Sequence, residues 1–304
     1  MSPMKEKVVV TGGAGFIGSH IADALVGGGY DVHVIDTLIA GKREHLPTAA
    51  TLHEVDVTDT DAIRPIITGA KAVFHEAALP RVQFSIDEPF ESHRANVDGT
   101  LSVLIAAREG RAGKVIFAAS SSAYGNQETL PLHEGLPPTP VNPYGLHKYI
   151  GEEYMKLFAG LYGLPTVSLR YFNVYGPRLD PEGPYALVIG RFLKQMQHKE
   201  PVTILGDGEQ TRDFTHVRDI VRANLLALER PVGKGEVINI GSGRSVTVNQ
   251  LADLFGASER ISLPPRVEAR HSRADITRAK ELLGWEPEVE FEEGVRELKE
   301  IFGV

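Results

Sequence analysis

Tyr144 and Lys148 are the residues whose types and spacing most directly suggest acid–base chemistry. Pro143 suits the first turn of a helix, and a helix beginning there places the two side chains one turn apart on the same face. A tyrosine is a weak base at its unperturbed pKa of about 10, but a neighbouring ammonium group favours the phenolate and lowers that pKa. The pair is therefore a candidate base with its partner, although the same spacing also occurs in ordinary surface contacts.

Three consecutive serines, Ser120, Ser121 and Ser122, precede this pair and follow an apolar segment at 114–118. We predict that this segment is a strand, and ligands bind at the carboxyl ends of parallel strands. A hydroxyl group at that point can relay a proton or polarise a carbonyl group, whereas a serine can also cap a turn. We expect one of the three to serve the chemistry and at least one to cap the turn.

A glycine-rich turn, Thr-Gly-Gly-Ala-Gly-Phe-Ile-Gly, follows an apolar strand near the N-terminus and opens a helix. Gly12, Gly15 and Gly18 allow the backbone to turn tightly, to approach a pyrophosphate and to pack helix against sheet. The start of the helix, at Phe16 and Ile17, supplies N–H donors and a favourable dipole. The spacing alone also fits a simple tight turn, but the strand–turn–helix context indicates a dinucleotide-binding site.

Asp36 ends the next predicted strand, 18 residues after Gly18. A carboxylate at this point accepts hydrogen bonds from both ribose hydroxyls of an adenosine and repels a 2′-phosphate, which favours NAD over NADP. Lys42 and Arg43 lie too far along the loop to clamp such a phosphate. The alternative is that Asp36 only forms a turn or a cap.

Further cofactor-binding candidates follow the later strands and the next helix. Asp56 and Val57 end the third strand, where a carboxylate and an apolar side chain suit the amine and the ring of adenine, although Asp56 is also a typical turn former. Ala77 and Ala78 are small where the chain must pass beneath a cofactor. Asn96 would otherwise be an ordinary polar residue inside a helix.

The segments that must position these residues alternate between strand and helix, which predicts an α/β fold with a doubly wound parallel sheet. The predicted strands are 7–11, 31–36, 51–55, 72–75, 114–118, 166–170 and 236–240, and the first helices are 15–26, 59–67, 89–108 and 143–161. Beyond residue 173, loops at 176–184, 206–209 and 262–266 separate shorter elements, with helices at 185–198, 217–229 and 276–283. We predict a cofactor-binding domain of residues 1–173 plus 214–241 and a smaller α/β substrate domain of residues 174–213 plus 242–304.

Composition excludes several classes of protein. The 304 residues are 42% hydrophobic and 24% charged, which is typical of a globular protein with a sizeable core. The formal net charge of -8 argues against nonspecific binding to nucleic acid. The absence of cysteine excludes disulfide scaffolds, thiolate zinc sites and cysteine nucleophiles. We see neither a signal peptide nor an apolar run long enough to span a membrane, and we expect a cytoplasmic protein.

Together the motifs resemble the extended short-chain dehydrogenase/reductase superfamily, in particular the nucleotide-sugar 4-epimerases of the UDP-glucose 4-epimerase type. The similarity runs from the glycine turn almost to the C-terminus and includes segments 169–178, 206–214, 216–219, 274–275 and 283–287. This set is highly specific for the superfamily and less specific for the reaction. The resemblance implies a Rossmann-type NAD-binding sheet, a UDP-sugar substrate and a homodimer formed through helices 89–108 and 143–161.

The resemblance also implies roles for individual residues. Ser120 matches the catalytic Ser/Thr of the family, and Tyr144 and Lys148 match the catalytic base and its partner. Tyr171 joins the cofactor-binding set. Asn173 matches the residue that contacts the sugar-proximal phosphate.

The remaining substrate-binding candidates come from the same resemblance. Arg212 and Arg266 match two arginines that grip the diphosphate, a task suited to guanidinium groups, and Arg270 is the alternative to Arg266. The others are Val188, Phe192 and Leu205 as an apolar bed for the uracil, Ser122 and the gate position Ser272 beside the sugar, and Arg81 as a contact to a sugar carboxylate. Core packing is the alternative role for the three apolar residues. For Arg81, the alternative is a contact with solvent or a salt bridge.

One departure from the family discriminates between reactions. Members that dehydrate a 4-keto sugar place an Asp-Glu pair after the catalytic Ser/Thr, and decarboxylating members keep the Glu. Ser121 and Ser122 stand at these positions and cannot ionise. We therefore expect inversion at C4 of a hexose, N-acetylhexosamine or hexuronate through a 4-keto intermediate. The alternatives are a dehydratase, a decarboxylase, a reductase, or a non-catalytic NAD-binding sensor or scaffold.

Overall fold

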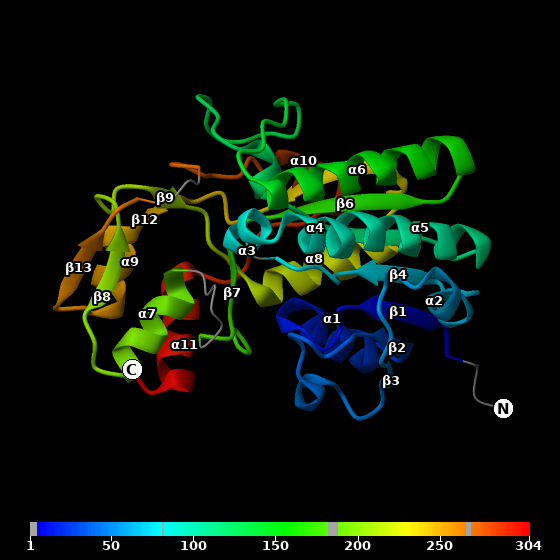
Figure 1. The fold of residues 1–304 in the computed structure, drawn as a ribbon, viewed down its shortest axis with the longest axis horizontal. Coiled ribbons are helices and arrows are strands. Elements are labelled where there is room, and N and C mark those ends of the chain that lie inside the picture. The colour runs from blue at the N-terminus through cyan, green and yellow to red at the C-terminus, as the bar shows by residue number, and fades with distance from the viewer. Residues whose placement is uncertain (1–4, 81, 182–187, 266–268) are drawn as a thin grey trace.

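The computed structural model describes residues 5–80, 82–181, 188–265 and 269–304. Arg81 and Arg266, two predicted substrate-binding residues, lie outside the described residues. The described chain forms two unequal lobes (Figure 1). The larger lobe is built around the main sheet, and the smaller lobe contains the elements labelled α7, α9 and α11 at the left of the view.

The strands of the main sheet are β1 (Lys7–Thr11), β2 (Asp31–Ile35), β3 (Thr51–His53), β4 (Ala72–His75), β5 (Val115–Ser120), β6 (Thr166–Tyr171) and β11 (Lys234–Ile240). Short strands elsewhere are β7 (Val174–Tyr175), β8 (Val202–Leu205), β9 (Thr211–Arg212), β10 (Thr215–His216), β12 (Val246–Thr247) and β13 (Arg260–Leu263).

The α-helices of the larger lobe are α1 (Phe16–Gly27), α2 (Thr60–Ile67), α3 (Val82–Asp87), α4 (Pro89–His93), α5 (Gly99–Glu109), α6 (Pro143–Tyr162), α8 (Val217–Glu229) and α10 (Thr277–Leu283). Those of the smaller lobe are α7 (Val188–Gln197), α9 (Val248–Phe255) and α11 (Phe291–Phe302). The short turns are η1 (Arg43–His45), the π-helical η2 (Arg94–Asp98) and η3 (Ser121–Tyr124).

Seven parallel strands in the order β11-β6-β5-β4-β1-β2-β3 confirm the predicted doubly wound sheet. The chain builds outward from β1 to β3 and then crosses back to β4, so the order reverses beside β1. The register pairs Thr11 with His75 and Ser120 with Tyr171. Because parallel strands share one carboxyl edge, these residues mark the edge at which such sheets bind ligands.

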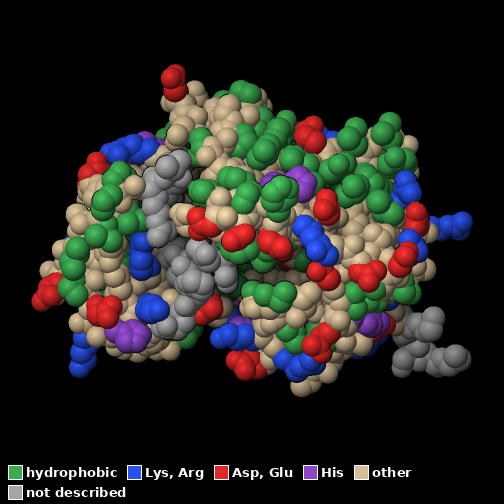
Figure 2. Space-filling model, in the orientation of Figure 1, with side chains coloured by type: hydrophobic (Ala, Val, Ile, Leu, Met, Phe, Trp, Pro, Cys, Tyr) green, Lys and Arg blue, Asp and Glu red, His purple; other side chains and the backbone are tan. Residues whose placement is uncertain are grey.

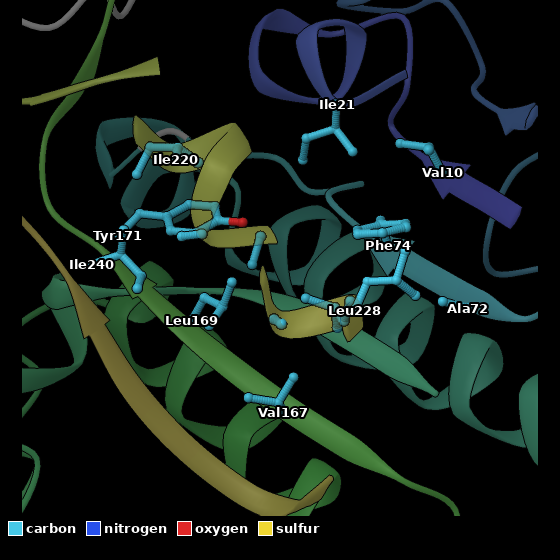
Figure 3. Packing of buried hydrophobic residues seen from close by; sticks show 14 of the residues in the cluster. Val10, Ile21, Ala72, Phe74, Val167, Leu169, Tyr171, Ile220, Leu228 and Ile240 are labelled. Carbon is cyan, nitrogen blue, oxygen red and sulfur yellow. The ribbon is translucent and has the colours of Figure 1, made fainter. Parts of the chain in front are cut away.

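Apolar side chains cover both faces of the sheet. One cluster joins the strands to α1 and α8 and includes Ile21, Phe74 and Ile220 (Figure 3). A second cluster lies on the opposite face, under α2, α5 and α6, and includes Phe117 and Met155. Strands buried on both sides read as continuous apolar runs without alternation, which is why the sequence located them correctly.

The smaller lobe has a core of its own. Residues of α7, β8, α9 and α11 pack together, with Phe192 and Phe255 in an edge-to-face contact. The predicted domain division stays a prediction, but Leu283 and Trp285, assigned by it to the substrate domain, are buried in the cluster on the main sheet. The indole nitrogen of Trp285 donates to the Asp219 carbonyl at 3.0 Å, which ties this segment to α8.

Several predicted elements need correction. The helix predicted at 89–108 is split into α4, η2 and α5, with Asn96 in the π-helical turn. The sequence also missed α3, α9 and α11, and part of the loop predicted at 262–266 belongs to β13. α3 is only six residues long, whereas α9 and α11 carry apolar residues at helical spacing, so the sequence did contain a signal for these two helices.

Within the described residues, no helix is both long and apolar enough to cross a membrane. Hydrophobic side chains gather over α6 at the upper right of Figure 2. Leu157 and Leu161 of α6 are 50% and 70% exposed, and Phe90 of α4 is 90% exposed. The homodimer was expected from helices 89–108 and 143–161, which correspond to α4, η2 and α5 together and to α6, and that assembly stays a prediction.

Candidate active site

The glycine turn connects β1 to α1 and brings backbone close to backbone. Gly12 has a φ of +66°, and a Cβ there would lie 2.7 Å from the Ala77 amide nitrogen. A Cβ at Gly18 would lie 2.3 Å from the Gly12 carbonyl oxygen. Gly15 begins α1 with no side-chain cap, so the N–H groups of the first turn remain open to an anion. This cradle fits the pyrophosphate of a dinucleotide.

Asp36 follows β2 and holds two loops together. Its carboxylate accepts from Ala14 N at 3.0 Å and from Leu38 N at 2.8 Å. Each carboxylate oxygen has two acceptor positions, so each keeps one for a ribose hydroxyl. Leu38 adopts a φ of +58°, a conformation that this hydrogen bond helps to hold. The residue thus performs the alternative turn-forming role and still fits the proposed contact to adenosine.

The loop after β4 is fixed by Asn96. The Asn96 Oδ1 accepts from Leu79 N at 2.8 Å, and its Nδ2 donates to Leu79 O at 3.2 Å and to Ser92 Oγ at 3.3 Å. Asn96 is buried and its amide group is occupied within the chain. It therefore positions the loop that carries Ala77 and Ala78, rather than presenting a free group to a cofactor.

Asp56 and Val57 lie at the far side of the sheet, after β3. Asp56 is exposed and accepts from Thr58 N at 2.8 Å, as a turn former does. Val57 is buried against α5, where a Cβ at Gly99 would lie 3.0 Å from its Cγ2. Their contact with adenine stays a prediction, and the structure shows the turn and the core contact.

Ser120 ends β5 and caps η3. Its hydroxyl accepts from Ser122 N at 3.1 Å and donates to Ser122 Oγ at 3.1 Å. Ser120 is therefore both the turn cap and the serine at the carboxyl edge, so the two expected roles fall on one residue. Ser121 lies in the same turn and brings no ionisable group to it.

Tyr144 is held at the start of α6 by contacts on three sides. Asn142 caps the helix through its Oδ1, which accepts from Gly145 N at 2.9 Å. A Cβ at Gly145 would lie 2.5 Å from the Ser122 carbonyl oxygen, so only glycine lets the helix approach the serine turn this closely. The Tyr144 amide donates to Ser85 Oγ at 3.1 Å. These contacts place the phenol beside Ser120.

The expected electrostatics of Tyr144 need correction. Burial raises the pKa of Tyr144 to about 12, more than its hydrogen bond with Ser120 lowers it, and the Glu76 carboxylate adds to the rise. Lys148 lies one turn on, as predicted, but its Nζ donates to the Ala118 carbonyl at 2.7 Å and sits 4.9 Å from the Phe117 ring centroid. Burial lowers the pKa of Lys148, so this ammonium does not by itself bring the phenol into a useful range.

Glu76 is a functional candidate that the sequence analysis missed. It is the first residue after β4, and its Oε1 accepts from the Tyr171 hydroxyl at 2.9 Å. Burial raises the pKa of the Glu76 carboxyl, while Tyr171 and Lys148 lower it. The signal was present, because an acid directly after a buried parallel strand lies at the ligand-binding edge.

Residues expected to hold the diphosphate line the loops between the lobes. Asn173 donates through Nδ2 to the Asp213 carbonyl at 3.0 Å. Arg212 donates through one guanidinium nitrogen to the carbonyls of Thr211 at 2.9 Å and Arg270 at 3.2 Å. Arg270 itself pairs with Asp207 at 2.6 Å on the surface. Arg266, the other candidate, lies outside the described residues, so the choice between Arg266 and Arg270 stays open.

Two of the apolar candidates for the uracil bed lie at the margin of the smaller core. Val188 begins α7 and Leu205 ends β8, and both are partly exposed. Phe192 is fully buried in the core of the smaller lobe, which fits the alternative role of core packing, and its contact with the uracil stays a prediction. A helix face is selected by the neighbouring helices, which the local sequence does not show.

Ser272, the predicted gate, is largely buried and accepts from Asp213 N at 3.3 Å. Its backbone N–H donates to the Thr211 carbonyl, and its carbonyl accepts from the Ser245 hydroxyl, so the residue connects three loops. The gate role stays a prediction. Asp213 beside it accepts hydrogen bonds from Ser242, Gly243 and Ala274 and anchors the junction of the two lobes.

A parallel sheet, a glycine turn after its first strand and a Ser/Tyr/Lys set at its carboxyl edge define a dinucleotide-binding protein of the short-chain dehydrogenase/reductase class. The chain belongs to the NAD dependent epimerase/dehydratase family, whose model matches residues 8–241.

Solved structures of relatives share nearly the whole chain. A UDP-glucose 4-epimerase from Thermotoga maritima, solved with UDP-glucose, is 44% identical, with a TM-score of 0.93 and 98% of each chain covered. A UDP-N-acetylglucosamine 4-epimerase from Methanobrevibacter ruminantium is 40% identical, with a TM-score of 0.92, covering 98% of this chain and 99% of the other. A UDP-glucuronic acid 4-epimerase from Bacillus cereus, solved with UDP-glucuronic acid and NAD, is 33% identical, with a TM-score of 0.89 and the same coverage.

Proposed function

We propose that the protein is an NAD-dependent 4-epimerase of a UDP-sugar. The observation that carries this proposal is the convergence of Ser120, Tyr144 and Lys148 at the carboxyl edge of the sheet, with the serines of η3 in place of ionisable side chains. Relatives that share the fold are named for 4-epimerisation of three different UDP-sugars, which supports the reaction and leaves the sugar to experiment.

The chain's own residues supply the proton chemistry. Tyr144 accepts the proton of the C4 hydroxyl, and Ser120, hydrogen-bonded with Tyr144, orients that hydroxyl. The glycine turn and Asp36 would hold NAD⁺, which would supply reversible hydride transfer at C4. Tyr144 then returns the proton to O4, so no oxidant or reductant is consumed.

Binding of the diphosphate makes the inversion possible. Asn173 and Arg212 border the junction of the lobes and offer amide and guanidinium donors to phosphate oxygens. Holding the nucleotide there lets the 4-keto sugar turn without leaving, because the reacting groups stay at high effective concentration. The glycine turn and Asp36 hold NAD in the adjacent half of the cleft.

A substrate panel tests the proposal. The purified protein is incubated with UDP-hexoses, UDP-N-acetylhexosamines and UDP-hexuronates without added NAD, and the products are analysed. We expect the 4-epimer of at least one sugar to accumulate to equilibrium. A dehydrated, decarboxylated or reduced product would contradict the proposal, and binding without any product would indicate a sensor or scaffold.

Tyr144→Phe tests the role of the phenol. We expect turnover to fall by about 10²–10⁴-fold, since the proton acceptor is removed, while bound NAD and the circular dichroism spectrum are retained. Tyr162→Phe is the matched control, because it removes a hydroxyl from the exposed end of the same helix and should leave turnover unchanged. Activity of Tyr144→Phe within tenfold of the unmodified protein would contradict this assignment.

A further inference from the structure

Glu76 brings a carboxyl group to the edge of the sheet where β4, β5 and β6 end. The register places the end of β4 beside β5, and Ser120 beside Tyr171, so the central strands deliver Glu76, Ser120 and Tyr171 to one region. Lys148 approaches from α6 and donates to the Ala118 carbonyl on β5. The carboxyl group thus lies among the groups of the proposed chemistry without belonging to the Ser/Tyr/Lys set.

A directional hydrogen-bond chain holds this carboxyl group. Asn224 Nδ2 donates to the Tyr171 hydroxyl at 2.7 Å and to the Ile220 carbonyl at 2.9 Å. An amide nitrogen is only a donor, so the Tyr171 oxygen accepts and its own proton must point to Glu76 Oε1, 2.9 Å away. Burial raises the pKa of Tyr171 far above its ordinary value, which keeps this proton in place. Figure 3 shows the Tyr171 ring beside Ile220 and Ile240 with its oxygen pointing away from them.

Because Oε1 is always the acceptor, any proton on Glu76 lies on the second oxygen. Burial raises the pKa of the Glu76 carboxyl, whereas the Tyr171 hydrogen bond and the Lys148 charge lower it. Burial lowers the pKa of Lys148, whereas Glu76 and Glu152 raise it. Glu152 already accepts both hydrogen bonds of the buried Arg170 guanidinium, at 2.7 and 2.6 Å. Of these two carboxylates, Glu152 is neutralised by Arg170, whereas no salt bridge is formed by Glu76 among the described residues.

We propose that the Glu76 carboxylate, held by Tyr171, is the counter-charge that keeps Lys148 protonated beside Tyr144. Glu76 is then a positioning residue, because it acts through Lys148 and Tyr144 rather than on the substrate. The ionisable groups that interact with it are Tyr171, which ends β6, and Tyr144 and Lys148 on α6, and Asn224 on α8 reaches it through Tyr171. The consequence for turnover rests on the proposed function, whereas the charge coupling does not.

The coupling predicts the sign of the shift at Lys148. A nearby negative charge raises the pKa of Lys148, so removing it lowers that pKa. Glu76→Gln keeps an oxygen that can accept from Tyr171 and removes only the charge. We expect the pKa of Lys148 to fall by about one unit, the size of a unit charge at several ångströms in a partly buried site.

The direct readout is a carbon-13 NMR titration of lysine Cε groups in the purified protein, with the Lys148 resonance assigned by its loss in Lys148→Met. Glu88→Gln is the matched control, because it removes an equal charge from an exposed position on the chain that follows β4. Solvent screening there should leave the pKa of Lys148 within about 0.2 units of the unmodified protein. Glu76→Asp, which retains the charge, should restore most of the shift.

A second variant and a pH profile of turnover test the same coupling. If Glu76→Gln does not fold, Tyr171→Phe removes the donor that favours the carboxylate and should shift the pKa of Lys148 downward by a smaller amount. With a UDP-sugar that turns over, the limb of the kcat profile that depends on protonated Lys148 should move toward lower pH in Glu76→Gln. An unchanged pKa of Lys148 in folded Glu76→Gln, or in Tyr171→Phe where the first variant is unfolded, overturns the proposal. A shifted pKa in a protein that turns over no UDP-sugar upholds the coupling and overturns only the proposed function.

Discussion

The two lobes make their binding groups in different ways. In the larger lobe the candidate groups come from backbone geometry and strand ends, as at Gly12, Gly18 and Ser120. In the smaller lobe and its loops the candidates are side chains, and the structure uses several of them internally. Phe192 fills the core and Ser272 supports the Asp213 backbone.

The difference teaches which kind of motif can be transferred from sequence to site. A glycine at a close backbone approach has one structural solution, so its role follows from its position. An apolar or hydroxyl side chain in a lobe assembled from short elements has many possible partners. Its role depends on segments distant in sequence. Three perturbations test this contrast between the larger lobe and the smaller lobe.

The largest effect is expected for the buried ion pair of the larger lobe. Arg170 is 2% exposed, its guanidinium contacts Glu152 at 2.6 Å, and it lies 4.4 Å from the Tyr124 ring centroid. Glu152→Gln should lower the free energy of unfolding by about 3–5 kcal/mol, because it leaves the buried cation without a counter-charge.

The matched control is the surface pair of the smaller lobe, Arg244 with Glu292, whose side chains are 54% and 44% exposed. Glu292→Gln should cost about 1 kcal/mol or less. Urea unfolding measures both variants. Equal losses would break the contrast between a larger lobe that depends on its charges and a smaller lobe that does not.

The next effect concerns the glycine turn. Gly12→Ala forces a Cβ against the Ala77 backbone at a φ of +66° and should cost about 2–3 kcal/mol, with loss of bound NAD. Gly29→Ala is the control, because Gly29 also has a positive φ, +84°, but a Cβ there meets nothing within 4 Å. It should cost only about 1 kcal/mol and keep the cofactor. Urea unfolding measures the free energy of unfolding of each variant, and the absorbance of released NAD measures the bound cofactor. Unchanged values in Gly12→Ala would contradict this prediction.

The smallest effect is a pH dependence from His75, which lies beneath the site. Its Nδ1 accepts from the Thr11 hydroxyl at 2.7 Å, and its Nε2 donates to Thr100 Oγ1 at 3.0 Å, whose own proton goes to the Asn96 carbonyl. Burial lowers the pKa of His75 to about 3. The ring therefore stays neutral in the folded protein while it gains a proton in the unfolded chain below about pH 6.5.

Because the unfolded state then binds the extra proton, stability falls as the pH falls from about 6.5 toward 3. Between pH 7 and pH 5 this contribution is about 2 kcal/mol. His75→Gln should be less stable at pH 7 but should lose about 2 kcal/mol less between those pH values. His271→Gln, on an exposed loop of the smaller lobe, serves as the control. Equal acid dependence in all three proteins would refute a neutral buried ring.

Much of the larger lobe follows from local sequence. Apolar runs located the strands, Pro143 marked the start of α6, and the spacing of Tyr144 and Lys148 placed them one turn apart. The long helix expected at 89–108 failed, because Asn96 bonds the loop after β4 and the chain takes a π-helical turn there. That contact joins residues 17 positions apart, and no periodicity reports it.

The amino-acid sequence by itself determined the strand–glycine turn–helix that opens the sheet and the one-turn spacing of Tyr144 and Lys148, because each depends on residues close together in the chain. Tertiary structure alone decided that Phe192 is core, that Lys148 bonds the Ala118 carbonyl, and that Glu76 meets Tyr171 across 95 positions of sequence. The physical reason is that burial and hydrogen-bond partners set the charge of an ionisable group, and both come from elements that only folding brings together.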